Sequence, residues 1–420
     1  MVVPSFRRRL ACYLGAMVIL HAVVFYGQWK YIRAGLPDFT IFYTAGKILD
    51  AGRAAQLYDD DLQRAIQQPI SMTVKNGGTI LPFNHPPFEA LVFAPVAELP
   101  YQTAYIVWFV VDFAIIAASI ALLRRHTLAL AKLPFWIWLL AAVGFPPLFV
   151  ALMHGQDVIW VLFCYVAAYV ALSHRNDFKA GAWLGLGLCK FHLILPFIFA
   201  FLAQNRRKVL AGFFLTALIL TVVGFAVVGV RTALDYPLYV WRAEHNAQYA
   251  WATDHSNNPN LRGLIVYFLP GGMPRLSTAI VIGISVCVLL SAAYIWKQLR
   301  SWGPEGDKLG FAVNVIATVL VSYHTWVQDL SLLLLPVVIV LDVLLTNPQL
   351  ASRLRRTLWF SAALLFCSPV YLVLLLRYRK FSLMTIAVLI FAAALLAMIR
   401  ALKNRTRVEL GFPAAEAVRN

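Results

Sequence analysis

The sequence predicts an all-α polytopic membrane protein. Of its 420 residues, 61% are hydrophobic and 13% are charged, and the mean hydropathy is +0.73. A soluble domain has about 45–50% apolar and about 25% charged residues, so this composition excludes an ordinary soluble protein. Eleven apolar stretches approach or exceed the length of about 20 residues that a helix needs to cross a bilayer. They cover residues 10–27, 101–123, 134–152, 157–173, 180–203, 209–230, 277–296, 309–323, 329–346, 358–376 and 382–400.

The net charge of +17 comes from short basic clusters between these stretches. The clusters are Arg7-Arg8-Arg9, Arg124-Arg125-His126, His174-Arg175, Arg206-Arg207-Lys208, Lys297 with Arg300, Arg353 with Arg355-Arg356, and Lys403 with Arg405 and Arg407. Loops rich in Lys and Arg stay in the cytoplasm, so the first cluster places the N-terminus there. The basic residues are thus topology signals, and nucleic acid is not an expected partner.

The stretch 180–203 determines the topology of everything that follows it. If it were a single span, most of the later basic clusters would lie outside the cell. We therefore expect two short helices that turn at Lys190-Phe191-His192. About twelve membrane helices, with both termini in the cytoplasm, then form one domain over residues 1–402. The domain has extracytoplasmic loops at 28–100 and 231–276 and is followed by a cytoplasmic tail at 403–420.

The polar residues of the first loop include a candidate catalytic group. Asp38 follows a proline and precedes a helical pattern of apolar residues that Gly52 can end. An aspartate at such a position is a good helix cap, because its carboxylate accepts bonds from free backbone N–H groups. The alternative is a general base at the mouth of a cavity. Both interpretations remain open at this level.

Further polar residues lie on the same, non-cytoplasmic side in the expected topology. They are Tyr43 and His85 in the first loop, Gln156 and Asp157 in a tight turn, Lys190 and His192 in the hairpin, Asn257, Asn260 and Arg262 in the second loop, and His324, Trp326 and Asp329 between two spans. Structural roles are open for them, since Asp157 could cap a helix and Lys190 could extend to the interface. Alternatively, they bind a sugar and a phosphate. The spacing of the His and Asp residues matches no standard metal site, so no metal and no other cofactor is expected.

Several stretches in this order resemble glycosyltransferase family 87, a family of GT-C fold enzymes that use polyprenyl-phosphate-linked sugars. They are Pro37-Asp38-Phe39 with Tyr43, His85-Pro86-Pro87-Phe88 leading to Phe93-Ala94-Pro95 and Leu99-Pro100-Tyr101, Gly155-Gln156-Asp157, Lys190-Phe191-His192, Asn258-Pro259-Asn260-Leu261-Arg262-Gly263, and Ser322-Tyr323-His324 with Asp329. The resemblance runs from about Pro37 to Pro336. The family includes mannosyltransferases of phosphatidylinositol mannoside synthesis. Residues 254–258 depart from the family pattern, so the resemblance does not imply which acceptor is used.

The resemblance implies an inverting transfer of a sugar, most simply mannose, from a polyprenyl-phosphate donor to a lipid-linked or glycan acceptor. Asp38 takes the place of the acidic residue proposed as the base in GT-C enzymes. Lys190, Arg262 and His324 would bind the donor phosphate. The remaining candidates would bind sugar or acceptor: Gln156, Asp157, His192, Asn257, Asn260, Asp329, Tyr43, His85 and Trp326. The site would face outward from the inner (plasma) membrane of a bacterium. Membrane lipids would surround the chain, and the donor's lipid tail would lie near Phe88 and Phe93.

The competing interpretation is a lipid or solute transporter, or flippase. Broken helices and intramembrane Lys and His residues are common in transporters as well. Two features favour the enzyme: the polar residues gather toward one face without lining a path across the membrane, and the sequence has no internal repeat. A purely structural subunit would explain the hydropathy but not the polar clusters.

Overall fold

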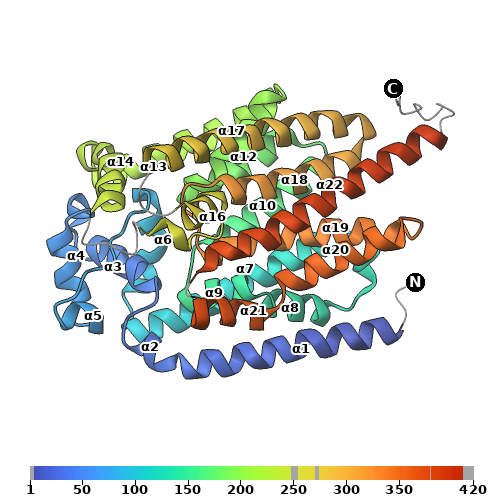
Figure 1. Cartoon of the computed structure of the whole chain (residues 1–420). Helices are drawn as coiled ribbons and strands as arrows, with labels where there is room; N and C mark the ends of the chain where they lie inside the picture. Colours follow the sequence, from blue (N-terminus) through green and yellow to red (C-terminus); the bar gives the residue numbers. More distant parts are fainter. Residues whose placement is uncertain (1–3, 247–253, 270–273, 379, 410–420) are drawn as a thin grey trace.

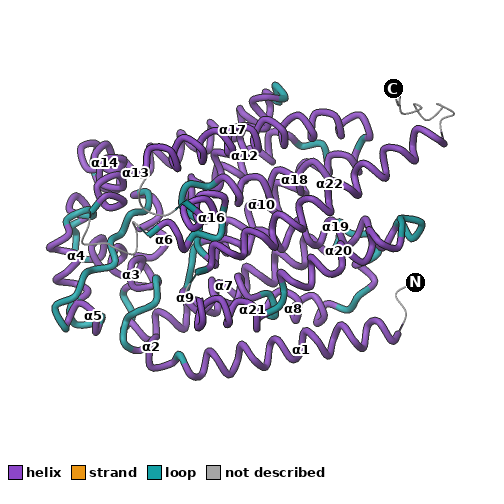
Figure 2. Tube along the Cα trace, viewed as in Figure 1, coloured by secondary structure: helices purple, strands orange, loops and turns teal. Residues whose placement is uncertain are grey.

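The computed structural model describes residues 4–246, 254–269, 274–378 and 380–409, and its regular elements in these ranges are all helical (Figures 1 and 2). Long helices form a bundle, and the short helices of the first loop gather at one end of it. The start of the first helix and the end of the last lie at the opposite end (Figure 1). The longest helices are α1 (Pro4–Gly27), α7 (Tyr101–Arg124), α13 (Arg207–Val228), α17 (Pro274–Leu299), α18 (Pro304–Val321) and α22 (Met384–Glu409).

The protein is a multi-pass membrane protein. The described ranges hold six helices long and apolar enough to cross a membrane, or up to nine if each of three bent pairs counts as one span. The pairs are α8 (Phe135–Val143) with α9 (Pro146–His154), α11 (Asp177–Leu186) with α12 (Phe191–Ala203), and α20 (Ser352–Leu365) with α21 (Ser368–Val373). The expected count of about twelve is reached only if α18, α10 (Val158–Ser173) and each half of the second pair also cross.

Residues 177–203 leave one end of the bundle and return to it. Arg206, just before α13, binds Asp177 at the start of α11 through Nη2–Oδ1 and Nε–Oδ2 contacts of 2.5 and 3.2 Å. Further along, Gly181 of α11 lies against Val209 of α13, and Gly185 lies against Thr216. Because α11 and α13 start together and run parallel, α12 must carry the chain back. The predicted hairpin is therefore present, with its break at Gly187, slightly before the expected residues.

Small residues make this parallel contact possible. A Cβ atom added to Gly181 would lie 1.8 Å from the carbonyl oxygen of Val209, and one added to Gly212 would lie 2.0 Å from that of Phe178. Close helix contacts through small residues are typical of membrane proteins, where packing rather than the hydrophobic effect holds helices together. The hairpin is thus packed against α13 by its glycines.

The first loop is a packed helical cap. Its helices are α3 (Phe39–Asp50), α4 (Asp60–Gln67), α5 (Met72–Lys75) and α6 (Pro87–Ala97). As predicted, α3 starts at Phe39, and Gly52 follows it with a positive φ of 68°. Pro87 starts α6, since proline is well suited to a first helical turn. Phe93 of α6 is 2% exposed and stacks on Phe42, so it belongs to the core of the cap and is not available to contact the donor's lipid tail as expected.

The second loop covers this cap. Helix α14 (Val230–His245) presents Tyr239, whose hydroxyl donates to Asp60 at 2.8 Å, and Tyr236, whose hydroxyl donates to the carbonyl of Asn84 at 3.4 Å. A short helix, α16 (Leu261–Phe268), follows. The two loops predicted from the gaps between apolar stretches are therefore one packed unit above the bundle.

The C-terminal segment differs from the expectation. Helix α22 continues to Glu409, beyond Lys403 where the tail was predicted to begin. Residues 410–420 of the predicted tail lie outside the described residues.

The hairpin predicts which residues share one side of the membrane. In a cysteine-free background, Asn176→Cys and Asn205→Cys, both at exposed positions, should react with an impermeant thiol reagent from the same side. Arg33→Cys, exposed near the first-loop cap, should react from the opposite side. Labelling of right-side-out and inverted vesicles measures this, and reaction of positions 33 and 205 from one side would contradict the hairpin.

Candidate active site

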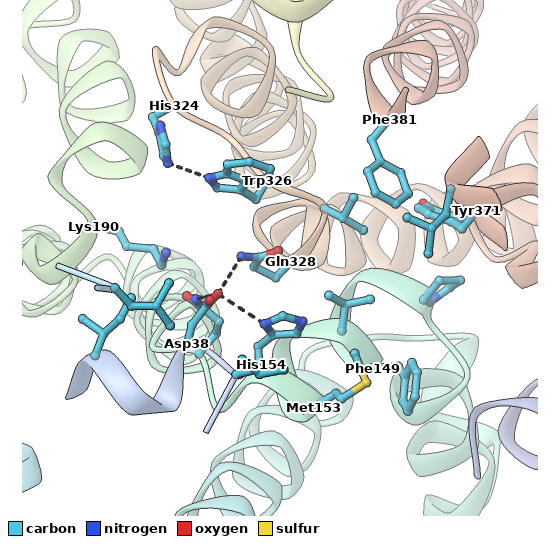
Figure 3. A pocket seen from close by; sticks show the side chains of 18 of the residues that line it. Asp38, Phe149, Met153, His154, Lys190, His324, Trp326, Gln328, Tyr371 and Phe381 are labelled. Carbon is cyan, nitrogen blue, oxygen red and sulfur yellow. Dashed lines mark hydrogen bonds and ion pairs between the residues drawn. The ribbon is translucent and has the colours of Figure 1, made fainter. Parts of the chain in front are cut away.

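A cavity of about 660 Å³ lies where the first-loop cap meets the bundle. One half of it is polar and the other apolar. The close-up in Figure 3 shows Asp38, Lys190, His324 and Gln328 on one side, and Phe149, Met153, Tyr371 and Phe381 toward the other. The polar half joins residues that are far apart in the sequence. Its ionisable and amide side chains include Asp38, His85, His154, Gln156, Lys190, His192, Glu244, His324 and Gln328.

Asp38 does not cap α3. Its own backbone is helical, with φ −62° and ψ −19°, and its carboxylate makes no capping hydrogen bond. The carboxylate oxygen Oδ2 instead accepts from Gln156 Nε2 at 2.5 Å and from Gln328 Nε2 at 3.5 Å, and it lies 3.4 Å from His154 Nδ1 (Figure 3). The cap interpretation is therefore wrong, and three side chains from other elements hold this carboxylate at the cavity.

These contacts keep Asp38 ionised. Burial raises the pKa of its carboxyl group, but the charge of His154 and the hydrogen bonds from His154 and Gln156 outweigh burial, so the pKa lies below its usual value. The side chain is 25% exposed, so it is reachable from the cavity. An ionised, reachable carboxylate can accept a proton from a bound hydroxyl group.

Lys190 lies between two carboxylates. Its Nζ atom is 3.2 Å from Asp157 Oδ1 and 3.3 Å from Asp329 Oδ1, and all three side chains are nearly buried. An isolated charge at membrane depth is costly, so pairing is the expected solution. Lys190 therefore does not extend to the interface, and Asp157 does not cap α10, where it makes no capping bond.

His85 extends this charged network. Its Nδ1 atom is 3.0 Å from Glu89 Oε2 and 3.5 Å from Asp157 Oδ2. Burial lowers the pKa of His85, but the two carboxylates raise it to about 9. The ligand atoms of His85, Glu89 and Asp157 lie within 4.8 Å of one another, close enough to hold a metal ion. The His85 proton and the Lys190 ammonium already balance much of this negative charge.

His324 is a neutral hydrogen-bond donor. Its Nε2 atom accepts from the Trp326 indole N–H at 2.6 Å, which leaves the ring proton on Nδ1, 3.4 Å from Glu244 Oε1. Burial, followed by the charges of Lys190 and of other nearby residues, lowers the pKa of His324 to about 3. His324 therefore lines the cavity as a neutral ring, without the positive charge expected of a phosphate-binding cation.

Seven of the thirteen predicted site residues line the cavity, and six do not. Those at the cavity are Asp38, His85, Gln156, Lys190, His192, His324 and Trp326. Asp157 and Asp329 lie behind Lys190. The other four make bonds elsewhere: Tyr43 donates to the carbonyl of Leu99, Asn257 accepts from the Phe381 N–H, Asn260 caps α16, and Arg262 donates to the carbonyl of Tyr323. Phe88 and Phe93 also lie away from the cavity lining.

Several polar residues at the cavity were not predicted, and three of them contact predicted site residues. His154 and Gln328 contact Asp38, and Glu244 faces His324. Each is near a predicted residue or polar cluster in the chain: His154 is two residues before Gln156, Gln328 precedes Asp329, and Glu244 begins the polar run of the second loop. This closeness in the sequence to predicted residues was the one feature that could have identified them as site residues.

The fold and the site define a polytopic membrane protein with an ionised, accessible carboxylate in a cavity at one end of its bundle. Residues 83–323 match glycosyltransferase family 87. The chain belongs to this family. Asp38 precedes the matched range, so its assignment rests on the geometry above.

Two curated relatives are mycobacterial enzymes. One, from Mycolicibacterium smegmatis, is named polyprenol-phosphate-mannose-dependent alpha-(1-2)-phosphatidylinositol mannoside mannosyltransferase; it is 26% identical over 312 residues, or 68% of this chain and 66% of the relative. The other, from Mycobacterium tuberculosis, is the corresponding pentamannoside mannosyltransferase, 25% identical over 265 residues, or 60% of this chain and 58% of the relative. The matches thus span less than two thirds of these relatives. No solved structure matches the chain.

The ion pairs of Lys190 predict a large effect on stability. Lys190→Met leaves Asp157 and Asp329 buried without their cation, so the free energy of unfolding should fall by about 3–5 kcal/mol. Lys47→Met is the matched control, because Lys47 pairs with Asp50 at an exposed surface and should contribute at most about 1 kcal/mol. Thermal unfolding in detergent measures both, and similar small shifts in the two variants would contradict the role of Lys190.

The positive charges of His85 and Lys190 balance much of the negative charge of Glu89 and Asp157. We therefore predict that this cluster needs no metal ion for its stability. EDTA should leave the melting temperature unchanged, and elemental analysis should find no stoichiometric divalent cation in the purified protein. A cation that is lost in parallel with stability on chelation, and that does not bind to the Glu89→Gln variant, would assign His85, Glu89 and Asp157 as metal ligands instead.

Proposed function

We propose that this protein is an inverting glycosyltransferase. It moves a sugar, most simply mannose, from a polyprenyl-phosphate donor to a lipid-linked or glycan acceptor. Membership of glycosyltransferase family 87 and the activities for which the two relatives are named support the donor class. The observation that carries the proposal is Asp38, whose carboxylate is held at the cavity by Gln156, Gln328 and His154 instead of capping its own helix.

The proposed reaction is a single displacement. Asp38 accepts the proton of the acceptor hydroxyl, whose oxygen forms a bond to the anomeric carbon of the sugar. The bond from that carbon to the phosphate oxygen breaks, and the polyprenyl phosphate leaves with the electron pair. Attack and departure on opposite faces invert the anomeric configuration. With Asp38 as the base, the proposed reaction requires no metal ion and no other cofactor.

Donor binding is proposed for residues that border the polar half of the cavity. Lys190 and His324 line it, and Arg262 is bonded to the backbone of Tyr323, which also lines it. These three contact the phosphate, through hydrogen bonds in a region shielded from water. His85, Gln156, His192 and Trp326 border the sugar and acceptor. Asp157, Asp329, Tyr43, Asn257 and Asn260 act indirectly, because they hold the cavity walls.

The membrane orientation is part of the proposal. The basic residues Arg7–Arg9 and Lys403 lie near the start of α1 and the end of α22, which share one end of the bundle, away from the first-loop cap (Figure 1). Basic ends stay in the cytoplasm. The cavity then faces outward from the plasma membrane of a bacterium, and both termini are cytoplasmic.

Asp38→Asn tests the base directly. Asparagine keeps the shape and the hydrogen-bonding oxygen of the side chain but removes its charge and basicity. Turnover at saturating donor should fall by about 10²–10⁴-fold, the usual contribution of a general base. The assay follows transfer of radiolabelled mannose from polyprenyl-phosphate-mannose to membrane lipids and glycans.

Two further measurements make the result specific. Donor affinity and the melting temperature of Asp38→Asn should remain near the wild-type values, because the carboxylate is not proposed to bind the donor. Asp50→Asn, an exposed change at the end of the same helix, should leave turnover unchanged. Near-wild-type turnover of Asp38→Asn would remove Asp38 from the chemistry.

A further inference from the structure

Helix α14 has two separate exposed surfaces. Its exposed apolar side chains form one face, here called the outer stripe: Val230, Leu234, Leu238 and Trp241. They are between 45% and 65% exposed. Residues that follow one another at intervals of three or four lie on one side of a helix. The exposed charged side chains form a neighbouring edge at similar intervals: Arg231, Asp235 and Arg242.

The third surface of α14 packs on the protein. The hydroxyl groups of Thr232, Tyr236 and Tyr239 all donate to groups of the first-loop cap. Next to them on the helix, Val240 and Glu244 line the cavity. A helix on a water-exposed surface needs one apolar face, the face toward the protein. The outer stripe is therefore a second apolar face, and the described part of the chain leaves it exposed.

The outer stripe continues the lipid-facing surface of α13. Helix α13 is long and apolar enough to cross a membrane, and it exposes a line of apolar side chains: Phe214, Leu215, Leu218, Ile219 and Val222. Exposed apolar side chains on a spanning helix face the hydrocarbon of the bilayer. Gly229, with a φ of 81°, is the single residue between α13 and α14. The stripe thus begins where α13 leaves the hydrocarbon.

The first-loop cap borders the membrane at the same level. Pro87, at the start of α6, lies against Gly224 of α13, about one turn before that helix ends. Leu91 and Val92 of α6 are 42% and 55% exposed. The boundary between hydrocarbon and headgroups therefore passes beside α6 and the end of α13. Figure 1 shows α14 at this end of the bundle, next to the cap.

We propose that α14 is an interfacial helix, whose outer stripe inserts into the lipid leaflet on the side of the first-loop cap and thereby fixes the cavity wall that the helix carries. Interfacial helices lie in the plane of the membrane, with apolar side chains at the acyl boundary and charged side chains among the headgroups. Trp241 suits this position, since tryptophan is enriched at membrane interfaces. The charged edge has two arginines and one aspartate, so the inserted stripe contributes more than attraction to acidic lipids.

A second protein chain fits the outer stripe less well than lipid does. The stripe is about 17 Å long from Val230 to Trp241, and it consists of four side chains. A stable protein–protein interface buries about 800 Å² on each partner, which is more than these side chains can supply. Lipid also covers the exposed surface of α13, which the stripe continues.

Insertion of the stripe affects the cavity through the opposite side of the helix. The bilayer holds α14 on one side and the cap holds it on the other, and Glu244 projects from it into the cavity wall. Glu244 Oε1 lies 3.4 Å from His324 Nδ1. Release of the stripe from the lipid would free this wall to move. The enzyme should therefore need an intact stripe to work in a bilayer.

Fluorescence quenching locates the stripe without measuring activity. In a cysteine-free background, Leu234→Cys and Leu238→Cys in the stripe, and Asp235→Cys and Arg242→Cys in the charged edge, each carry the same small fluorophore. Leu218→Cys on α13 is the lipid-facing reference. In phosphatidylcholine nanodiscs, a lipid with a nitroxide high on its acyl chain should quench the stripe positions at least about twofold more than the edge positions. Iodide in the water should give the opposite order.

Two results of this measurement would overturn the proposal. Strong quenching by iodide at all four positions of α14 would place the whole helix in water. Protection of the stripe from both quenchers would show that protein covers it, and chemical crosslinking would then distinguish a second copy from another segment of the same chain.

Sugar transfer tests the effect on the cavity, and this part rests on the proposed function. The combined change Leu234→Asp and Leu238→Asp puts two charges into the stripe, whereas Arg231→Asp with Arg242→Asp puts them into the edge as the matched control. In nanodiscs, kcat/KM of the stripe variant should fall by at least about tenfold, because a displaced wall misplaces the reacting groups. The control should stay within about twofold of wild type.

The melting temperatures of the two variants in detergent should be similar, because neither change touches the packed side of α14. Equal transfer by the stripe variant and its control would overturn the effect on the cavity wall. Absence of transfer by the wild-type protein would refute the proposed function, and quenching would still decide the position of α14.

Discussion

The site depends on one buried cation, the ammonium of Lys190. It binds Asp157 and Asp329, which lie at the starts of α10 and of the 3₁₀ segment Val327–Leu333. The chain neighbours of these two carboxylates, Gln156 and Gln328, are the amides that donate to Asp38. Lys190 therefore positions Asp38 indirectly: it fixes the two turns from which the amides project. Asp38 is therefore held by two segments that lie more than a hundred residues away in the sequence. Those segments meet at Asp38 because their carboxylates, Asp157 and Asp329, both pair with Lys190.

This constraint also explains the broken helix. A Lys side chain in a continuous span would leave its charge in lipid at a cost of about 2.5–3.5 kcal/mol. The hairpin of α11 and α12 ends that span early and brings Lys190 to the carboxylates at the inner wall of the cavity. Its glycines then allow α11 to pack closely on α13, and the Asp177–Arg206 pair joins the two ends. Charge pairing at the break and small-residue packing along the helices thus maintain the same hairpin.

The sequence predicted what depends on patterns of residue type. Apolar length located the spans, basic clusters required the hairpin, and Gly52 marked the end of α3. It could not predict the directions of side chains. Asp38 has the residue type of a helix cap, but its backbone is helical rather than extended; Asn260 resembles a sugar ligand, but it caps α16. The apolar half of the cavity gave no signal at all, since Val23 and Val24 are the same residue type and only tertiary packing places Val24 in the cavity.

The distribution of charge limits the donors that suit this cavity. Lys190 is already matched by two carboxylates, His324 is neutral, and Glu244 adds a further carboxylate beside it. The cavity therefore has little excess positive charge with which to bind a phosphate. A diphosphate donor would bring more negative charge and would call for a metal ion to neutralise its leaving group. A monophosphate carries less negative charge and needs fewer donors, which suits a cavity whose Lys190 ammonium is already paired with two carboxylates.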